Sequence, residues 1–116
     1  MKLYIYKNCG TCRKAVKYLK AKGLEVETLP IREQPPSKAE LKRMLGIYDG
    51  EMRRLFNTSG QDYRALDMKS RLPEMGVDEA IKLLSENGNL IKRPFLLTEG
   101  SGLVGFKENE WDSLFF

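Results

Sequence analysis

Apolar residues recur along the chain with two different periods, and the order of those periods predicts a mixed α/β fold. Residues 2–6 alternate weakly and contain Leu, Tyr and Ile, which predicts a strand. From Cys12 onwards the apolar positions have the spacing of one helix face, and Gly23 is a typical helix stop. Residues 25–31 predict a second strand, so a right-handed β-α-β unit is favoured. The expected helix face consists of Cys12, Ala15, Val16 and Leu19.

Helical periodicity returns in the middle of the chain. A capping box opens at Ser37, and the apolar residues after it give the next helix its buried face. Residues 51–72 are mostly polar with short apolar pairs, which predicts several short helices. Residues 77–84 repeat the helical spacing, and Asn87-Gly88 ends that helix. The expected buried positions of the two longer helices are Leu41, Met44, Leu45, Val77, Ala80, Ile81 and Leu84.

The last part of the chain predicts a hairpin and a short helix. Residues 95–97 and 103–106 are expected to form two strands around a turn at residues 99–102. Trp111 and the apolar residues after it would close a C-terminal helix against the core. The order is therefore β-α-β, a helical middle and β-β-α, which is a thioredoxin-like α/β plan with a helical insertion at about residues 35–90. We expect a single domain over residues 1–116.

Composition narrows the class of protein. With 116 residues, 41% of them hydrophobic and 31% charged, the chain is typical of soluble globular domains that bury their own core. The net charge is +4, and residues 1–23 hold seven Lys or Arg and no acidic residue. This favours an anionic partner near the N-terminus, although most of the lysines are more simply explained as a solvated helix face. The total charge is too small to predict direct nucleic-acid binding.

Hydropathy and the N-terminal sequence predict the compartment. No apolar run approaches the roughly 20 residues of a membrane span, and the first residues enter a strand pattern rather than a signal or transit peptide. We therefore expect no membrane association and a cytoplasmic location. In that compartment a C-x-x-C motif is more often catalytic, redox-sensing or metal-binding than structural.

The candidate chemistry lies in the motif Cys9-Gly10-Thr11-Cys12, which contains the only two cysteines of the chain. A C-x-x-C at a strand-to-helix junction is typical of a thiol redox site. Cys12 falls on the apolar helix face and is expected to be partly buried, whereas Cys9 lies outside that face at the start of the helix. The helix N-terminus and the nearby cations Lys7, Arg13 and Lys14 are expected to lower the pKa of Cys9.

These positions suggest different roles for the two thiols. Cys9 is the natural attacking thiol, and Cys12, one helical turn away, is within disulfide reach as the resolving thiol. Gly10 would leave room for a substrate, and the hydroxyl of Thr11 could face an anion. Three alternatives remain: two buried structural cysteines, a zinc site, and a sensor disulfide without turnover. Zinc is disfavoured because the chain has no histidine, which also argues against a Cys-His protease.

The cassette at residues 9–14, together with Lys92-Arg93-Pro94 and residues 103–106, resembles the arsenate reductase (ArsC)/Spx family, in particular its short YffB/YusI-like branch. The resemblance covers essentially the whole chain. It implies a thioredoxin fold with an inserted helical bundle and an arsenate-attacking cysteine at Cys9. Arsenate reductases that use glutathione and glutaredoxin carry serine at the position of Cys12. Spx-type regulators carry the second cysteine and use the pair as a redox switch.

The resemblance also implies which residues bind the anion. Arg93 matches a family arginine that precedes a cis proline, here Pro94, and could pair with an anionic substrate or a glutathione carboxylate. Arg53 matches a second arginine, although Arg54 could take its place. The third falls at Lys107, which keeps the charge but loses the bidentate geometry of a guanidinium.

The leading hypothesis is a thiol-dependent reductase that acts on an arsenate-like oxyanion or a glutathione mixed disulfide. Glutathione is the expected co-substrate, with glutaredoxin or thioredoxin as partners and no bound cofactor or metal. The alternative is an Spx-like redox-sensing regulator that binds RNA polymerase through the region of Asp49-Gly50. It is ranked lower because Spx-type regulators have a longer, basic C-terminal extension. A third possibility is a thioredoxin-like scaffold that acts on the disulfide of another protein.

Overall fold

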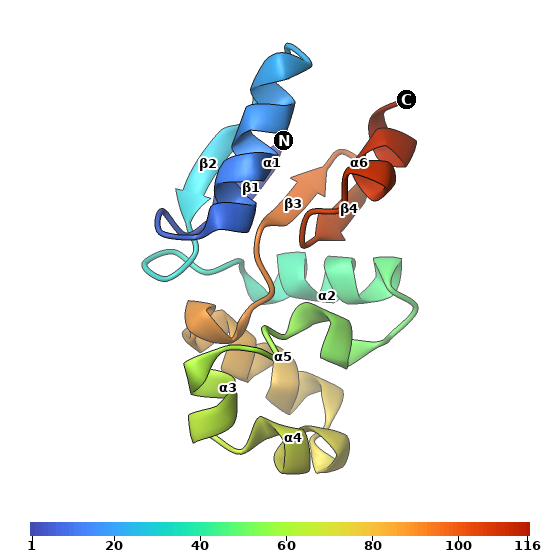
Figure 1. The fold of residues 1–116 in the computed structure, drawn as a ribbon. Helices are drawn as coiled ribbons and strands as arrows, with labels where there is room; N and C mark the ends of the chain where they lie inside the picture. The colour runs from blue at the N-terminus through green and yellow to red at the C-terminus, as the bar shows by residue number, and fades with distance from the viewer.

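The computed structural model describes all 116 residues, and their elements follow the predicted order (Figure 1). The first β-α-β unit comprises β1 (Lys2–Ile5), α1 (Gly10–Ala21) and β2 (Glu27–Pro30). The chain ends with the hairpin β3 (Phe95–Thr98) and β4 (Ser101–Val104) and the helix α6 (Glu108–Phe115). Between β2 and β3 lie only helical elements: α2 (Lys38–Ile47), η1 (Met52–Leu55), α3 (Gln61–Ala65), α4 (Met68–Arg71), η2 (Leu72–Glu74), α5 (Val77–Glu86) and η3 (Gly88–Leu90).

The four strands form one mixed sheet in the order β2-β1-β3-β4. Strand β1 pairs in parallel with β2 and antiparallel with β3, which pairs antiparallel with β4. Figure 1 shows this sheet in the upper half of the molecule, with α3, α4 and α5 in the lower half. The thioredoxin-like α/β prediction with a helical insertion is confirmed.

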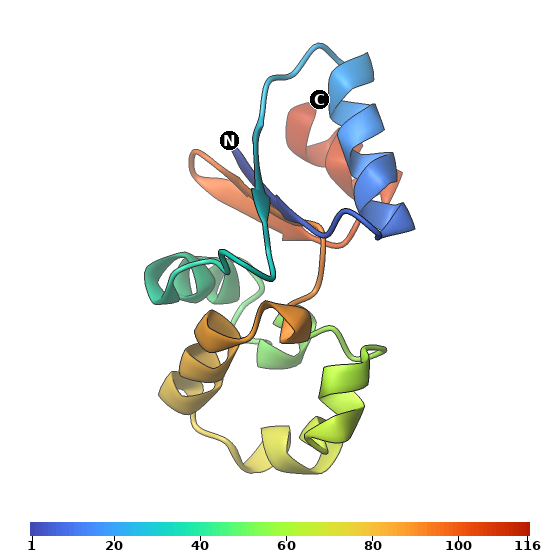
Figure 2. The ribbon, with the colours of Figure 1, turned by 90° about the vertical axis from the view of Figure 1, so that its left-hand side faces the viewer.

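Side chains alternate between the two faces of the sheet, and each face has its own core. Leu3 and Leu96 lie opposite each other on β1 and β3 and pack with residues of α1 and α6. In Figure 2 both helices lie on the same side of the sheet. Trp111 is fully buried in this smaller core, and its indole N–H donates to the Gly105 carbonyl at 3.1 Å.

The opposite face joins the sheet to the helical insertion in a core of 17 buried residues. Tyr4, Phe95 and Val104 contribute from the strands, and Met44 and Ile81 are among those contributed by α2 and α5. Because one continuous core joins sheet and insertion, the helices are held in a fixed position beside the end of the sheet where the cysteine motif lies.

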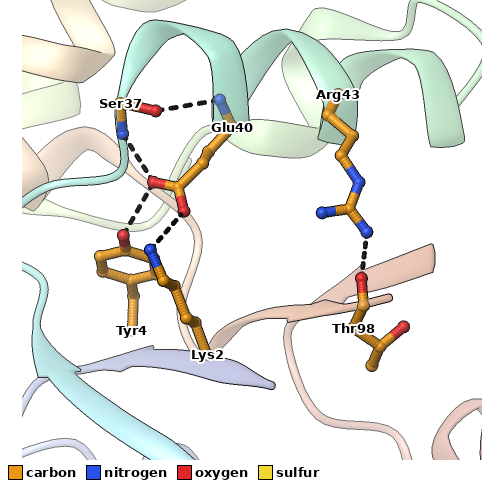
Figure 3. Close-up of polar contacts among 6 residues, drawn as sticks. All are labelled: Lys2, Tyr4, Ser37, Glu40, Arg43 and Thr98. Carbon is orange, nitrogen blue, oxygen red and sulfur yellow. Dashed lines mark hydrogen bonds and ion pairs between the residues drawn. The ribbon is translucent and has the colours of Figure 1, made fainter. Parts of the chain in front are cut away.

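Polar contacts also fix α2 on the sheet (Figure 3). The predicted capping box is present between Ser37 and Glu40. The Glu40 carboxylate accepts the Tyr4 hydroxyl at 2.8 Å and pairs with the Lys2 ammonium at 3.3 Å. Burial tends to raise the pKa of Glu40, but the hydrogen bonds from the Ser37 N–H, Tyr4 and Lys2 outweigh it and lower that pKa. In the middle of the helix Arg43 donates to the carbonyl of Thr98.

Local details differ from the expected pattern. The hairpin turn is shorter than predicted, because β4 already begins at Ser101 and Gly102 pairs with Leu97. Val16 is only partly buried, whereas Tyr18 is buried on α1 because its ring packs on α6 and its hydroxyl donates to Asp112 at 2.5 Å. Val77 is 55% exposed, since α5 starts there before its buried face begins. No helix of the structure has the length and hydropathy needed to cross a membrane.

Candidate functional site

Cys9 occupies the N-cap position of α1. Its N–H donates to the Tyr6 carbonyl at 3.1 Å, which turns the chain from the end of β1 into the helix. Its Sγ accepts a hydrogen bond from the Cys12 N–H at 3.3 Å, and the first turn of the helix contains no acidic residue. The sulfur therefore faces free N–H groups and the positive end of the helix dipole, an arrangement that favours a thiolate.

The two cysteines have opposite acid-base properties. Burial tends to raise the pKa of Cys9, but hydrogen bonds from the thiol and N–H of Cys12, together with the charge of Arg93, outweigh it and lower that pKa. Cys12 is 1% exposed, and its burial, with the hydrogen bond and charge of Cys9, raises its pKa to about 12. Both cysteines are free. At neutral pH Cys9 is thus the available nucleophile, and Cys12 stays protonated behind it.

The cation that acts on Cys9 comes from a distant part of the chain. Arg93 precedes Pro94 through a cis peptide bond, as the resemblance implies, and its guanidinium lies over the Tyr6 ring at 5.1 Å. Its Nη1 is buried and makes no hydrogen bond, so a donor at this position is free for a ligand. The sequence favoured Lys7, Arg13 and Lys14 as the activating cations, whereas in the structure the cation that lowers the pKa of Cys9 is Arg93. Arg13 instead donates to the Lys7 carbonyl at 3.3 Å, which ties down the loop before the helix.

A cleft of about 1230 Å³ opens in front of Cys9 between the sheet and the insertion. Its lining is strongly basic, with five Lys or Arg side chains against the carboxylates of Glu51 and Glu110. Such a charge balance favours an anionic ligand. Five of the predicted site residues line this cleft together, namely Cys9, Thr11, Arg53, Arg93 and Lys107.

The structure distinguishes Arg53 from Arg54, both of which line the cleft. Arg54 pairs with Glu51 at 3.7 Å and stacks on the Tyr48 ring at 4.6 Å. Arg53 makes neither an ion pair nor a side-chain hydrogen bond. Its guanidinium is therefore free for an anionic ligand, which favours the match chosen from the sequence. Lys107 is exposed at the start of α6 and is likewise unpaired.

The remaining predicted site residues lie outside the cleft lining. Cys12 is buried behind Cys9, and Arg13 is exposed on α1. A Cβ at Gly10 would have no protein neighbour within 4 Å, so the fold itself would accept a larger residue there, and the predicted role of Gly10 in leaving room for a substrate stays a prediction. Pro94 is buried, and its carbonyl accepts the Gly105 N–H at 2.8 Å, which positions the segment that forms one wall of the cleft.

Sequence reasoning missed several residues of this region. Lys92, Phe106 and Glu110 line the cleft, and Tyr6 supports the guanidinium of Arg93. Tyr6 could have been found from its position just after β1, since that strand ends beside the cysteine motif. Glu110 on α6 has no comparable sequence signal that would place it at the cleft. No group of three or more His, Cys, Asp or Glu side chains with the geometry of a metal site is present.

Comparison with known proteins gives consistent matches over nearly the whole chain. Uncharacterized protein YusI of Bacillus subtilis is 47% identical over 110 residues, which are 94% of this chain and 92% of YusI. The global transcriptional regulator Spx of Streptococcus mutans is 28% identical over 108 residues, covering 93% of this chain and 77% of Spx.

Solved structures agree with these sequence matches. An ArsC family related protein from Bacteroides fragilis superposes with a TM-score of 0.91 at 40% identity, covering 97% of this chain and 95% of the other. A possible arsenate reductase from Streptococcus mutans UA159 superposes with a TM-score of 0.87 at 36% identity, covering 96% of each chain. The ArsC family model matches residues 4–114, and the chain therefore belongs to the ArsC family.

Proposed function

We propose that this protein is a cytoplasmic thiol-dependent reductase in which Cys9 attacks an anionic substrate. The observation that carries the proposal is the position of Cys9, at a helix N-terminus and beside Arg93, in a cleft with an excess of basic residues. A thiolate needs such an environment to persist near neutral pH, and an anionic substrate is attracted to the same charges.

The first step forms a covalent bond to Cys9. With an arsenate-like oxyanion, the Cys9 thiolate attacks As(V), an As–O bond breaks, and the oxygen leaves as water after taking up protons. With a mixed disulfide of glutathione, the thiolate attacks one sulfur, the S–S bond breaks, and the other sulfur leaves as a thiolate. Arg93 and Arg53 would hold the negative charge of either substrate through charge-assisted hydrogen bonds.

A second thiol completes the reduction. On an arsenic adduct it attacks the sulfur of Cys9, which forms a disulfide and releases As(III) with the bonding electron pair. On a glutathione adduct, either Cys12 attacks the sulfur of Cys9 and releases glutathione, or a second glutathione attacks the glutathione sulfur, which forms glutathione disulfide and frees the Cys9 thiolate. Glutathione can reach Cys9 through the open cleft, whereas Cys12 must first lose its proton. Burial is the main cause of the raised pKa of Cys12, and the hydrogen bond and charge of Cys9 add to it. A Cys9 held in a disulfide carries no charge, so the part that the Cys9 charge contributes is absent from such an adduct. Glutathione, glutaredoxin or thioredoxin would then return the two electrons.

Steady-state reduction with three variants tests the proposal. Arsenate and a glutathione mixed disulfide are offered separately, with glutathione and glutaredoxin or with thioredoxin as reductant. Cys9→Ser should abolish turnover of the true substrate, and Arg93→Gln should lower it strongly. Arg64→Gln, an exposed arginine that does not line the cleft, is the matched control. Equal rates for Cys9→Ser and the wild-type protein would refute the reductase assignment.

Cys12→Ser then separates the two resolving routes. If Cys12 resolves the adduct, this variant should accumulate a mass adduct on Cys9 and lose activity with thioredoxin. If glutathione resolves it, turnover with glutathione should persist.

A redox-regulated partner of RNA polymerase is the second candidate, favoured by the match to Spx. Asp49 and Gly50 form an exposed turn after α2, with φ values of 56° and 82°, next to Glu51 on the cleft lining. A pull-down of RNA polymerase with the oxidised and the reduced protein tests this candidate. Retention that depends on the Cys9–Cys12 redox state would support it, and no retention in either state would remove it.

A further inference from the structure

A second, smaller cavity of about 210 Å³ lies on the other side of Arg93. It is formed where the segment after β2 meets α3 and η3 of the insertion. Arg93 and Asn57 line both this cavity and the cleft in front of Cys9, so the two spaces adjoin through these two side chains. Nothing in the chemistry of Cys9 described above uses the groups that line only the smaller cavity.

Charges of both signs meet in this cavity without pairing with each other. Arg32 and Asp62 line it together with Arg93, yet none of the three takes part in any of the three ion pairs of the protein. Arg32 and Arg93 lie over the Tyr6 ring, at 5.0 and 5.1 Å. Arg32 donates to the Tyr6 hydroxyl at 3.0 Å, which leaves most of its guanidinium donors unused.

The acidic side of the cavity is equally free to receive a ligand. One carboxylate oxygen of Asp62 accepts the Asn87 side-chain amide at 3.1 Å, which orients the group, and the other oxygen has no hydrogen-bond partner. The amides of Asn57, Gln61 and Asn89 add neutral donors and acceptors around it.

This set of groups selects against ligands with a single sign of charge. A simple anion would gain from Arg32 but would be repelled by Asp62, and a simple cation would meet two arginines. A zwitterion satisfies both signs at once, because its carboxylate can pair with the guanidinium of Arg32 while its ammonium pairs with the carboxylate of Asp62. The volume exceeds several-fold the roughly 30 Å³ that one water molecule occupies, which gives room for an amino-acid head group.

We propose that the smaller cavity binds the free α-amino acid end of a peptide-sized thiol or mixed disulfide, with its carboxylate on Arg32 and its ammonium on Asp62, while its sulfur reaches Cys9 through the adjoining cleft. The proposal rests on the proposed reductase function and names the substrate class of the same site. The γ-glutamyl end of glutathione has this chemistry.

Gly60 keeps the junction of the two cavities open. A Cβ at Gly60 would lie 2.7 Å from the side-chain Nδ2 of Asn57 and 3.2 Å from its carbonyl oxygen. A larger residue there would displace the Asn57 amide, which lines both spaces. Glycine at this position therefore lets the amide approach closely and remain between the sulfur end and the amino-acid end of the ligand.

Binding of an unreactive probe tests the subsite without requiring turnover. S-methylglutathione is compared by calorimetry with two analogues, one lacking the α-ammonium and one with the α-carboxylate converted to an amide. The wild-type protein should bind each analogue about tenfold more weakly than S-methylglutathione, the loss expected for one charge-assisted hydrogen bond. Equal affinities for all three ligands would overturn the proposal.

Two variants then assign each charge to its partner. Asp62→Asn should lose the preference for the ammonium and keep the preference for the carboxylate, and Arg32→Gln should do the reverse. Arg64→Gln and Asp67→Asn, exposed residues that line neither cavity, are the matched controls and should keep both preferences. Loss of both preferences in both variants, with thermal unfolding unchanged, would contradict the assignment of the groups.

A third measurement separates this proposal from the reductase function. Reduction of 2-hydroxyethyl disulfide, which has no charged end, by the wild-type protein reports the chemistry of Cys9 alone. Reduction of this disulfide without any discrimination among the glutathione analogues would refute the subsite and leave the reductase standing. Discrimination among the analogues by a protein that reduces neither a disulfide nor arsenate would support the subsite and refute the reductase.

Discussion

Selective alkylation at neutral pH should distinguish the two cysteines sharply. When the native protein is treated with iodoacetamide at pH 7.5, we expect Cys9 to be modified and Cys12 to remain a free thiol. The physical reason is that Cys9 has a lowered pKa at the helix N-terminus, whereas burial raises the pKa of Cys12 to about 12. Only the thiolate reacts at a useful rate.

The size of the difference follows from the thiolate populations. At pH 7.5 a thiol of pKa about 12 is ionised to about 3 × 10⁻⁵, whereas an ordinary thiol of pKa about 8.5 is ionised to about one part in ten. Cys9 is ionised further than an ordinary thiol, so the ratio is at least about 3000. A more basic thiolate is a better nucleophile. With a Brønsted slope of about 0.45, the Cys12 thiolate is intrinsically roughly 40-fold more reactive than an ordinary thiolate, which offsets part of its lower population. Cys12 should therefore react about 80-fold more slowly before its 1% exposure is considered.

Mass spectrometry measures both rates in one sample. Trypsin cleavage after Lys7 and Arg13 leaves both cysteines in one peptide, so fragmentation of that peptide must locate the label. The Cys9→Ser variant reports Cys12 alone, and in strong denaturant the two thiols should react alike. Labelling of native Cys12 within tenfold of the rate of Cys9 would refute the assignment of Cys12 as a buried, protonated thiol.

Three further outcomes are expected from the charges and contacts of the structure. Arg93→Gln should raise the pKa of Cys9 and move the pH dependence of Cys9 alkylation to higher pH, whereas Arg13→Gln should leave it unchanged. An equal shift in the two variants would contradict the assignment of Arg93 as the cation that acts on Cys9. Because the folded state keeps the Cys12 proton that the unfolded state loses, the wild-type free energy of unfolding should fall above about pH 8.5, by about 2 kcal/mol at pH 10. Cys12→Ala should lack this decline in urea titrations, and a parallel decline would be inconsistent with the raised pKa. Glu40→Ala removes one half of the capping box and the acceptor of the Tyr4 hydroxyl. The free energy of unfolding from urea titration should therefore fall by about 1–3 kcal/mol. An unchanged urea midpoint would show that this network is not stabilising.

Helical spacing and capping signals predicted most of the fold because they are local properties of the sequence. The capping box at Ser37 and the buried face from Leu41 to Leu45 are both present. Predictions failed where tertiary contacts decide the outcome. Tyr18 is buried because α6, almost a hundred residues later, supplies a partner for both its ring and its hydroxyl. Gly102 lies in a strand rather than a turn because it pairs across the hairpin with Leu97.

The candidate site was predicted unevenly for the same reason. The positions of Cys9 and Cys12 relative to the helix followed from the apolar spacing alone. The activating cation could not be predicted in this way. Proximity in sequence favoured Arg13 and its neighbours, whereas the fold brings Arg93 to the Cys9 thiol. Arg53 was selected by resemblance, and the two arginines are separated only by tertiary contacts, the ion pair of Arg54 with Glu51 and its stacking on the Tyr48 ring.

The position of Arg93 couples the charge of the substrate to the charge of Cys9. Its guanidinium favours the Cys9 thiolate on one side and lines the smaller cavity on the other. A single cation cannot stabilise two anions at full strength, since each anion reduces the field that the other experiences. In the proposed subsite Arg32 resolves this conflict, because it offers a second guanidinium on the same Tyr6 ring and would hold the ligand carboxylate while Arg93 acts on the thiolate. Two arginines on one aromatic ring would therefore let the carboxylate of a zwitterionic ligand end bind next to a thiolate without suppressing its ionisation.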